Sequence, residues 1–275
     1  MQFNFRPLAI ARIVAAISLA GTLGACALPP KDDPEALAEF KAANDPFEPA
    51  NRLVFAMNNT VDTLILQPVA VTYRDLAPVE LKTPFENVIT NLLMPLSIIH
   101  ALLQGDMERA DKAAQRFAGG VATLMLGNTL PSEEPVYEDA GQTLGVWGVD
   151  SGPYVMLPLL GPSNFRDTTG TVLDFFMDPV GYIARPGSSI ARGVSRATIN
   201  RSKNVDAVRD LERNSLDYYA AVRSLYRQRR DAQIDNGQGE SQPTSPTIGI
   251  DSDAPKPTSG ANANGSADAP KADGG

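Results

Sequence analysis

The chain has very little sulfur or imidazole chemistry. Its 275 residues include one cysteine, Cys26, and one histidine, His100. A single cysteine cannot close an intramolecular disulfide, so the folded body depends on its own core. Sites built from several histidine and cysteine ligands are excluded for the same reason. We therefore expect no metal centre and no cofactor.

Positive charge is also scarce. The chain has 24 lysines and arginines against 32 acidic residues, a net charge of −8. The segment before Cys26 carries Arg6 and Arg12 but no acid, so its removal makes the chain more acidic. Binding to nucleic acid and polybasic adhesion to anionic lipid both need a basic face. The composition argues against both, and any membrane contact beyond a covalent lipid must be apolar.

The motifs of common enzyme classes are missing. The sequence has no Gly-x-Ser-x-Gly nucleophile elbow and no phosphate-binding loop of the Gly-x-x-x-x-Gly-Lys-Ser/Thr type. His100 lies in an apolar segment, where we expect a packed or hydrogen-bonded core residue. Asp106 and Glu108 are explained by the start of a helix, and Arg166-Asp167 by a helix start or an ion pair. We expect a binding protein with no catalytic residue.

The N-terminal apolar run is too short to span a bilayer, which takes about 20 residues. It extends from Ile13 to Gly24 after a basic start, which is typical of a secretory signal. The run ends in Leu23-Gly24-Ala25-Cys26, the box that the bacterial lipoprotein pathway reads. The sequence therefore predicts cleavage before Cys26 and lipidation of its thiol and amino group. The alternative is a plain signal peptide followed by an unmodified cysteine.

A lipidated Cys26 would hold the chain on a membrane. Each buried acyl methylene contributes about 0.8 kcal/mol, and two or more chains give stable attachment. Ala27 follows the cysteine, where an aspartate would favour retention at the inner membrane in enteric bacteria. We expect an outer-membrane lipoprotein whose body faces the periplasm.

We divide the chain into four parts. Residues 1–25 are the signal peptide, 26–43 the acylated cysteine and a tether, 44–234 one globular domain, and 235–275 a disordered tail. The tail has no aromatic residue and consists mainly of Gly, Pro, Ser, Ala, Asn and Asp. Such a composition cannot bury enough apolar surface to offset its ordering entropy.

Helix-start residues and apolar spacing predict an all-α domain with no alternating strand. The expected helices run from the cap Asp45 to Pro68, from Thr83-Pro84 to Pro95, from Pro95 to Gly105, from Asp106 towards Leu126 with Gly127 as the stop, and from Ser202 to Arg230.

The segment 84–103 forms two apolar helices of about ten residues in this interpretation, broken at Pro95. Each would be about 15 Å long, half the hydrocarbon thickness of a bilayer. Buried core helices and helices lying within one leaflet both fit this pattern, and periodicity does not separate them.

Residues 127–165 are rich in glycine and proline and long for a connection inside a helical body, which is typical of functional loops. Their apolar side chains must pack against protein or lipid. Trp147 is either an interfacial anchor or a core residue, and Glu133-Glu134 are expected in solvent.

The motifs, taken in order, resemble the MlaA/VacJ family of intermembrane phospholipid transport lipoproteins. The resemblance covers about 180 residues. It comprises Asn44-Asp45-Pro46-Phe47-Glu48, Asn51-Arg52, Asp62, Pro68-Val69-Ala70, Tyr73-Arg74-Asp75, Pro78, Asn87, Asn91, Pro95, Leu103-Gln104-Gly105-Asp106, Arg116-Phe117, Gly127, Gly141-Gln142-Thr143-Leu144-Gly145, Trp147-Gly148-Val149, Gly152-Pro153-Tyr154, Leu157-Pro158, Gly161-Pro162-Ser163, Arg166-Asp167, Asp178-Pro179, Asp217-Tyr218, Arg223 and Tyr226.

The resemblance implies a ring of short helices in the inner leaflet of the outer membrane, with an amphipathic channel for phospholipid. It favours the leaflet interpretation of residues 84–103. It also implies contact with a trimeric porin and with a periplasmic carrier that feeds an inner-membrane ABC transporter. The candidate channel or gating residues are Gly141, Gly145, Trp147, Gly148, Gly152, Pro153 and Tyr154.

Three function classes follow. The first is a lipoprotein that removes mislocalised phospholipids from the outer leaflet without covalent catalysis and so maintains lipid asymmetry. The second is a structural adaptor that binds porins or other envelope proteins and moves no lipid. The third, a lipid hydrolase, lacks an evident pair of nucleophile and base.

Overall fold

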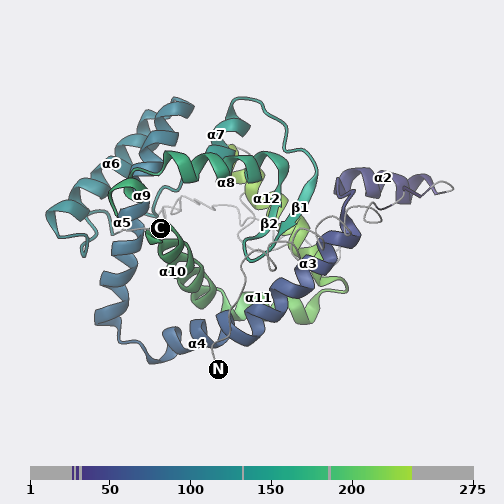
Figure 1. The fold of residues 1–275 in the computed structure, drawn as a ribbon, viewed down its shortest axis with the longest axis horizontal. Coiled ribbons are helices and arrows are strands. Elements are labelled where there is room, and N and C mark those ends of the chain that lie inside the picture. Colours follow the sequence, from purple (N-terminus) through teal and green to yellow (C-terminus); the bar gives the residue numbers. More distant parts are fainter. Residues whose placement is uncertain (1–26, 28, 31–32, 132, 185–186, 237–275) are drawn as a thin grey trace, which may run out of the picture. The chain divides into compact units, whose positions relative to one another are not determined.

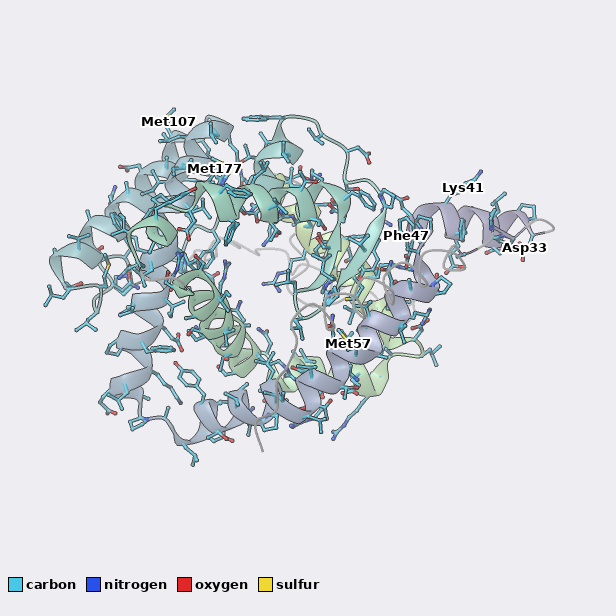
Figure 2. The ribbon with its side chains drawn as sticks, viewed as in Figure 1. Asp33, Lys41, Phe47, Met57, Met107 and Met177 are labelled. Carbon is cyan, nitrogen blue, oxygen red and sulfur yellow. The ribbon has the colours of Figure 1, made fainter. Side chains whose placement is uncertain are left out.

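The computed structural model describes residues 27, 29–30, 33–131, 133–184 and 187–236, all within the unit Met1–Gln242. The lipobox, Cys26 and the predicted tail beyond Asn236 lie outside the described residues. The predicted tether includes a helix, α2 (Pro34–Ala43), which is capped by the Asp33 carboxylate at the amides of Glu35 and Ala36. Figure 2 labels Asp33 and Lys41 near its two ends.

The described domain is helical, which confirms the predicted all-α class (Figure 1). Its helices after α2 are α3 (Glu48–Val61), α4 (Gln67–Leu76), α5 (Val79–Gln104), α6 (Met107–Ala122), α7 (Ala140–Val146), α8 (Phe165–Met177), α9 (Pro179–Ile183), α10 (Ser188–Lys203), α11 (Val205–Asn214) and α12 (Tyr218–Ile234). A π-helical turn, η1 (Asp62–Leu66), joins α3 to α4.

The predicted end of the first helix at Pro68 is wrong. The backbone stays helical through η1 into α4, and Pro68 is an early residue of α4. A π-turn changes the hydrogen-bond register, and the first turn of a helix tolerates a residue without an N–H. The chain leaves the helix only at Ala77, whose backbone is extended before Pro78.

The predicted break at Pro95 and start at Thr83 are also wrong. One helix, α5, spans 26 residues with Pro84 and Pro95 inside it. Proline removes one backbone donor from the helix, and nearby carbonyls then need other partners. Arg192 donates to the carbonyl of Leu92, three residues before Pro95, at 3.2 Å. Packing along α6, seen side by side with α5 in Figure 1, supports the continuous helix.

Helix α6 begins as predicted and ends earlier. The Asp106 carboxylate caps it by accepting from the amide of Arg109 at 2.9 Å. The helix stops at Ala122, and Leu124 and Met125 take left-handed backbone angles. The buried Asn91 amide donates to the carbonyls of Met125 and Gly127, which explains why the chain turns before Gly127.

The predicted single helix from Ser202 to Arg230 is wrong. The region contains the end of α10, then α11, then α12. Asn204 separates α10 from α11, and the extended Ser215 ends α11. The Asp217 carboxylate starts α12 by accepting from the amide of Ala220. A continuous apolar spacing therefore concealed two changes of direction.

The expectation of no strand is wrong for one hairpin, formed by β1 (Tyr154–Leu157) and β2 (Gly161–Asn164). The strands are antiparallel, with Tyr154 opposite Asn164 and Leu157 opposite Gly161. Side chains on α3 complete the hydrogen bonding of β1: Asn51 accepts from the amide of Met156, and Asn58 donates to the carbonyl of Leu157. Four-residue strands held by a distant helix leave little pattern in the sequence.

The described interior is unusually polar. Its buried apolar side chains form small clusters, one around Met94 and Val136 and one around Tyr154, Met156 and Tyr219. Among the described residues, buried polar and charged side chains outnumber buried apolar ones. Buried charges need partners, so hydrogen bonds and ion pairs hold much of this domain together.

Candidate functional site

Large apolar side chains cover much of the exposed surface. They include Leu53 and Met57 on α3, Leu64 and Ile65 on η1, Val69 and Leu76 on α4, Val79, Leu81 and Phe85 on α5, Leu159 and Leu160 in the hairpin turn, Val172, Leu173, Phe175 and Phe176 on α8, and Tyr182 and Ile183 on α9. Met57 on α3 and Met107 at the start of α6, both labelled in Figure 2, are among the exposed side chains. On a soluble monomer exposed apolar side chains are usually scattered singly, whereas here they recur on successive elements from α3 to α9. This surface fits an apolar environment or a partner.

One helix, α5, is long and apolar enough to cross a bilayer, judged by length and composition within the described residues. Core helices pass the same test, and α5 packs extensively on α6. Its length therefore does not decide how it meets a membrane.

A buried ion network connects α12 to α7 and α8. Arg230 donates to Asp139, which caps α7, at 2.6 and 2.8 Å, and to Asp167 on α8 at 2.8 Å. Asp167 also accepts from Arg166 at 3.0 Å and from the Tyr226 hydroxyl. Two carboxylates and two arginines thus neutralise one another, with Asp167 and both arginines largely buried and Asp139 partly exposed.

The network changes the acidity of its members. Burial would raise the pKa of Asp139, but the hydrogen bonds and charge of Arg230, with help from Gln142, hold that pKa at about 2. Burial and the neighbouring Asp167 raise the pKa of Tyr226 above its usual range. A third of the Asp139 side chain is exposed, so solvent screens part of its interaction with Arg230.

A second network joins the start of the domain to α12. Asp45, which is 2% exposed, accepts from Asn51 at 2.8 Å, from the Tyr219 hydroxyl at 2.5 Å and from Arg223 at 2.8 Å. Asp45 was predicted as a helix cap, but its carboxylate serves this network instead, and α3 begins after Phe47 without a side-chain cap. The prediction considered local sequence only, and two of the partners, Tyr219 and Arg223, lie more than 170 residues away.

The chain is similar in sequence to known proteins of one family. The model of the MlaA lipoprotein family matches residues 43–233. The intermembrane phospholipid transport system lipoprotein MlaA of Escherichia coli is 34% identical over 210 residues, which cover 73% of this chain and 81% of the relative. An uncharacterised protein of Rickettsia bellii is 31% identical over 199 residues, covering 69% and 76%.

A solved structure described as the structural basis for maintenance of bacterial outer membrane lipid asymmetry is also similar. It has a TM-score of 0.61 and 34% identity, and the match covers 69% of this chain and 98% of that one. The chain belongs to the MlaA lipoprotein family. The resemblance inferred from separated motifs is therefore confirmed.

Two glycines predicted at the channel of this MlaA family member lie in close helix packing. A Cβ atom on Gly141 would come within 2.6 Å of Asp167 Oδ1 and within 2.5 Å of an Arg230 nitrogen. A Cβ on Gly145 would come within 2.9 Å of the Ile234 side chain. Both glycines let α7 approach the ion network.

The other predicted channel residues divide between surface and core. Trp147 ends α7 and is 58% exposed, with its indole N–H donating to the carbonyl of Leu103 at 3.1 Å. Gly148 and Gly152 have positive φ angles, +86° and +66°, in the turns that follow. The Pro153 carbonyl accepts from the amide of Phe165. Tyr154 is 2% exposed and packs edge-on against Tyr219 and Tyr226.

His100 is a packed core residue, as predicted. It is 1% exposed, with Nδ1 3.0 Å from the Thr143 hydroxyl and Nε2 2.9 Å from Asp174 Oδ1. Glu133 and Glu134 are exposed, also as predicted. Within the part of the chain that the structure describes, no group of three His, Cys, Asp or Glu residues is placed to hold a metal ion.

The structure adds polar residues that local reasoning did not assign to a site. They are chiefly Arg230 and Asp139, together with the buried pair Arg192–Asp178 on α10 and at the start of α9. The spacing of Tyr219, Arg223, Tyr226 and Arg230 puts these side chains along one side of α12. That polar stripe is the signal that could have identified the network.

Proposed function

We propose that this chain is an outer-membrane lipoprotein that removes mislocalised phospholipids from the outer leaflet and passes them to a periplasmic carrier. The described surface supports this proposal, because exposed apolar side chains cover several of its elements while charged groups pair inside. The proposal extends to this chain what the name of the E. coli relative says of that protein.

The mechanism needs no bond to be made or broken. A phospholipid crosses a membrane slowly because its charged headgroup must leave water. A passage with polar groups for the headgroup, bordered by an apolar surface for the acyl chains, lowers that barrier. We propose that the helices form a ring around such a passage within the inner leaflet, with no catalytic residue and no cofactor. Trp147, Gly148 and Gly152 remain its candidate gating residues.

Helix length does not support the leaflet placement. At about 1.5 Å per residue, the 26 residues of α5 are longer than one leaflet is thick, so α5 must lie tilted. The distribution of exposed side chains carries the proposal. In this arrangement a lipidated Cys26 holds the body at the leaflet, a trimeric porin flanks it, and the carrier feeds an inner-membrane ABC transporter.

Phospholipid on the cell surface tests the function. A deletion strain should accumulate phospholipid in the outer leaflet, and the wild-type chain should clear it. The Cys26→Ala variant should fail to clear it, since no acyl chain then retains the protein at the membrane. The measurement is an outer-leaflet-selective lipid assay. An unchanged outer leaflet after deletion would refute transport and leave the adaptor class as the better description.

Trp147 provides a spectroscopic test of membrane contact, because it is the chain's single tryptophan. Its ring is exposed, and the exposed residues Leu103, whose carbonyl accepts from the indole, and Val146, its chain neighbour, are also apolar. In phospholipid vesicles its emission should shift to the blue, and brominated lipids should quench it by about half or more, because indole rings favour the membrane interface. Unchanged emission, with full quenching by aqueous acrylamide, would place this end of α7 in water.

A further inference from the structure

Helix α10 is basic in an otherwise acidic protein. Its sixteen residues include four arginines and lysines and no acid. Three of the four have carboxylate partners on other elements: Arg192 with Asp178, Arg201 with Asp62, and Lys203 with Glu86. Arg196 differs from them. Among the described residues, no carboxylate lies within ion-pair distance of its guanidinium.

An aromatic ring holds the Arg196 guanidinium in place. Its central carbon lies 4.2 Å from the centre of the Tyr137 ring. The Tyr137 hydroxyl is in turn 3.2 Å from that of Thr90 on α5, and the ring packs on the cluster that contains Met94. Stacking on a ring face leaves the N–H groups at the guanidinium edge free to donate. Such an edge matches two oxygens of a phosphate.

An apolar strip runs along another face of the same helix, about 120° round the axis from Arg196 and separated from it by Gly193. Ile190 is 72% exposed and Val194 59% exposed, and Ala197 continues the strip one turn later. Residues three and four apart share one side of a helix, so these side chains form a continuous surface. At about 1.5 Å per residue, the strip from Ile190 to Ala197 is about 10 Å long, which matches part of an acyl chain.

Gly193 lies between the arginine and the strip and leaves an open gap. A Cβ atom at this position would meet nothing within 4 Å, and the residue does not have a positive φ. Glycine is a poor former of helix interiors. Neither packing nor backbone conformation requires it here, whereas a larger side chain would cover the surface next to Arg196.

We propose that Arg196, Gly193, Ile190 and Val194 form a phospholipid-binding seat, called the α10 seat below. Arg196 binds the phosphate through its free edge, and an acyl chain crosses Gly193 onto Ile190 and Val194. The seat rests on the proposed function, since it gives the transported lipid a binding site. The adjacent apolar strip favours a lipid phosphate over free phosphate as the ligand.

Retention of lipid by the purified protein tests the seat. The full acylated chain in dodecyl maltoside micelles is mixed with dioleoyl phosphatidylglycerol or with dioleoylglycerol, which has the same acyl chains and no phosphate. Lipid retained per protein is then measured by native mass spectrometry. Arg196→Gln should lower phosphatidylglycerol retention about tenfold, the loss of a charge-assisted pair, and leave dioleoylglycerol unchanged. Arg229→Gln, at an exposed arginine of α12, is the matched control and should change neither.

A second variant separates binding from folding. Gly193→Leu should lower retention of both lipids by filling the gap. Its unfolding temperature should equal or exceed that of the wild type, since leucine favours the helix and the site has room. Arg196→Lys, which keeps the charge but loses the planar fork, should retain an intermediate amount of phosphatidylglycerol.

Contrary outcomes are distinguishable. If Arg196→Gln retains phosphatidylglycerol as the wild type does, the seat is refuted and the proposed function stands. An equal loss of both lipids in Arg196→Gln would also refute it, because Arg196 would then act through structure. Calorimetric binding of inorganic phosphate alone, as tight as that of phosphatidylglycerol, would make this a phosphate site. If the wild type retains no phospholipid, the proposed function fails together with the seat.

Discussion

Replacing Arg230 by methionine will lower the free energy of unfolding by about 3 kcal/mol, as expected when one partner of a buried ion pair is removed. The substitution leaves Asp139 without its arginine, and Asp167 keeps only Arg166, Asn164 and Tyr226. The guanidinium is almost wholly covered, with 11% of the Arg230 side chain exposed. Its two carboxylate partners belong to α7 and α8, so the loss affects the packing of three helices.

Urea or thermal unfolding in detergent micelles, followed by circular dichroism, measures this effect. Arg229→Met is the matched control, because the neighbouring Arg229 is exposed, and it should change stability by less than about 0.5 kcal/mol. Adding Asp139→Asn to Arg230→Met should recover part of the loss, since one unpaired charge disappears. If Arg229→Met and Arg230→Met lowered the free energy of unfolding equally, the ion pairs of Arg230 would not be what stabilises the protein.

The pairing of Arg230 with Asp139 also predicts that the free energy of unfolding depends on pH. The pKa of Asp139 falls from 3.8 to about 2 on folding, so its contribution is complete above about pH 5 and is lost progressively as the pH falls towards 2. Solvent screening makes this contribution smaller than that of a fully buried pair. Arg230→Met should lack this acid-dependent loss, and unfolding curves between pH 2 and 5 would show it.

The second large effect is expected at Gly170 on α8. A Cβ atom there would lie 2.4 Å from the backbone nitrogen of Gly141 and 2.7 Å from its Cα. Backbone atoms cannot move aside as a flexible side chain can, so α7 and α8 would have to separate. Gly170→Ala should therefore destabilise the protein by about 2 kcal/mol, although alanine favours a helix by about 1 kcal/mol over glycine. Gly170→Val should lower the free energy of unfolding further than Gly170→Ala does, because its side chain is larger.

Gly193 on α10 provides the control for this prediction. Nothing lies within 4 Å of a Cβ at that position, so Gly193→Ala should raise stability by about 0.5 to 1 kcal/mol through helix propensity alone. Both variants would be compared by unfolding under the same conditions. A stabilising Gly170→Ala would show that the close approach of α7 and α8 is not required.

The helical class and several helix boundaries could be predicted from short stretches of sequence. The Asp106 cap is a property of adjacent residues, and it is confirmed because the local chemistry has no competitor. The buried His100 was also predictable from its apolar surroundings. Pro68 and Pro95 were not, because a proline does not end a helix where a π-turn precedes it or where packing on a neighbouring helix holds the residues on both sides.

The polar network was beyond local reasoning for a different reason. Asp139 and Arg230 are far apart in the sequence, and each alone is typical of a solvated helix residue. For Asp167 the local sequence indicated a helix start or an ion pair with Arg166, but not the contact with Arg230. Asp45 stands where a helix cap is expected, yet its carboxylate accepts hydrogen bonds from Tyr219 and Arg223 instead of capping α3. A buried charge takes the partner that tertiary packing brings to it, and that partner is absent from any local window.

The sequence by itself determined the helical class, the family and the lipobox that predicts an anchor at Cys26. These depend on composition, spacing and motifs, which do not change when the chain folds. Only the tertiary structure decided which apolar side chains are exposed, because exposure depends on neighbouring helices. It also decided that Arg230 of α12 pairs with Asp139, the cap of α7, and with Asp167 of α8, whereas Arg196 on α10 pairs with a tyrosine ring.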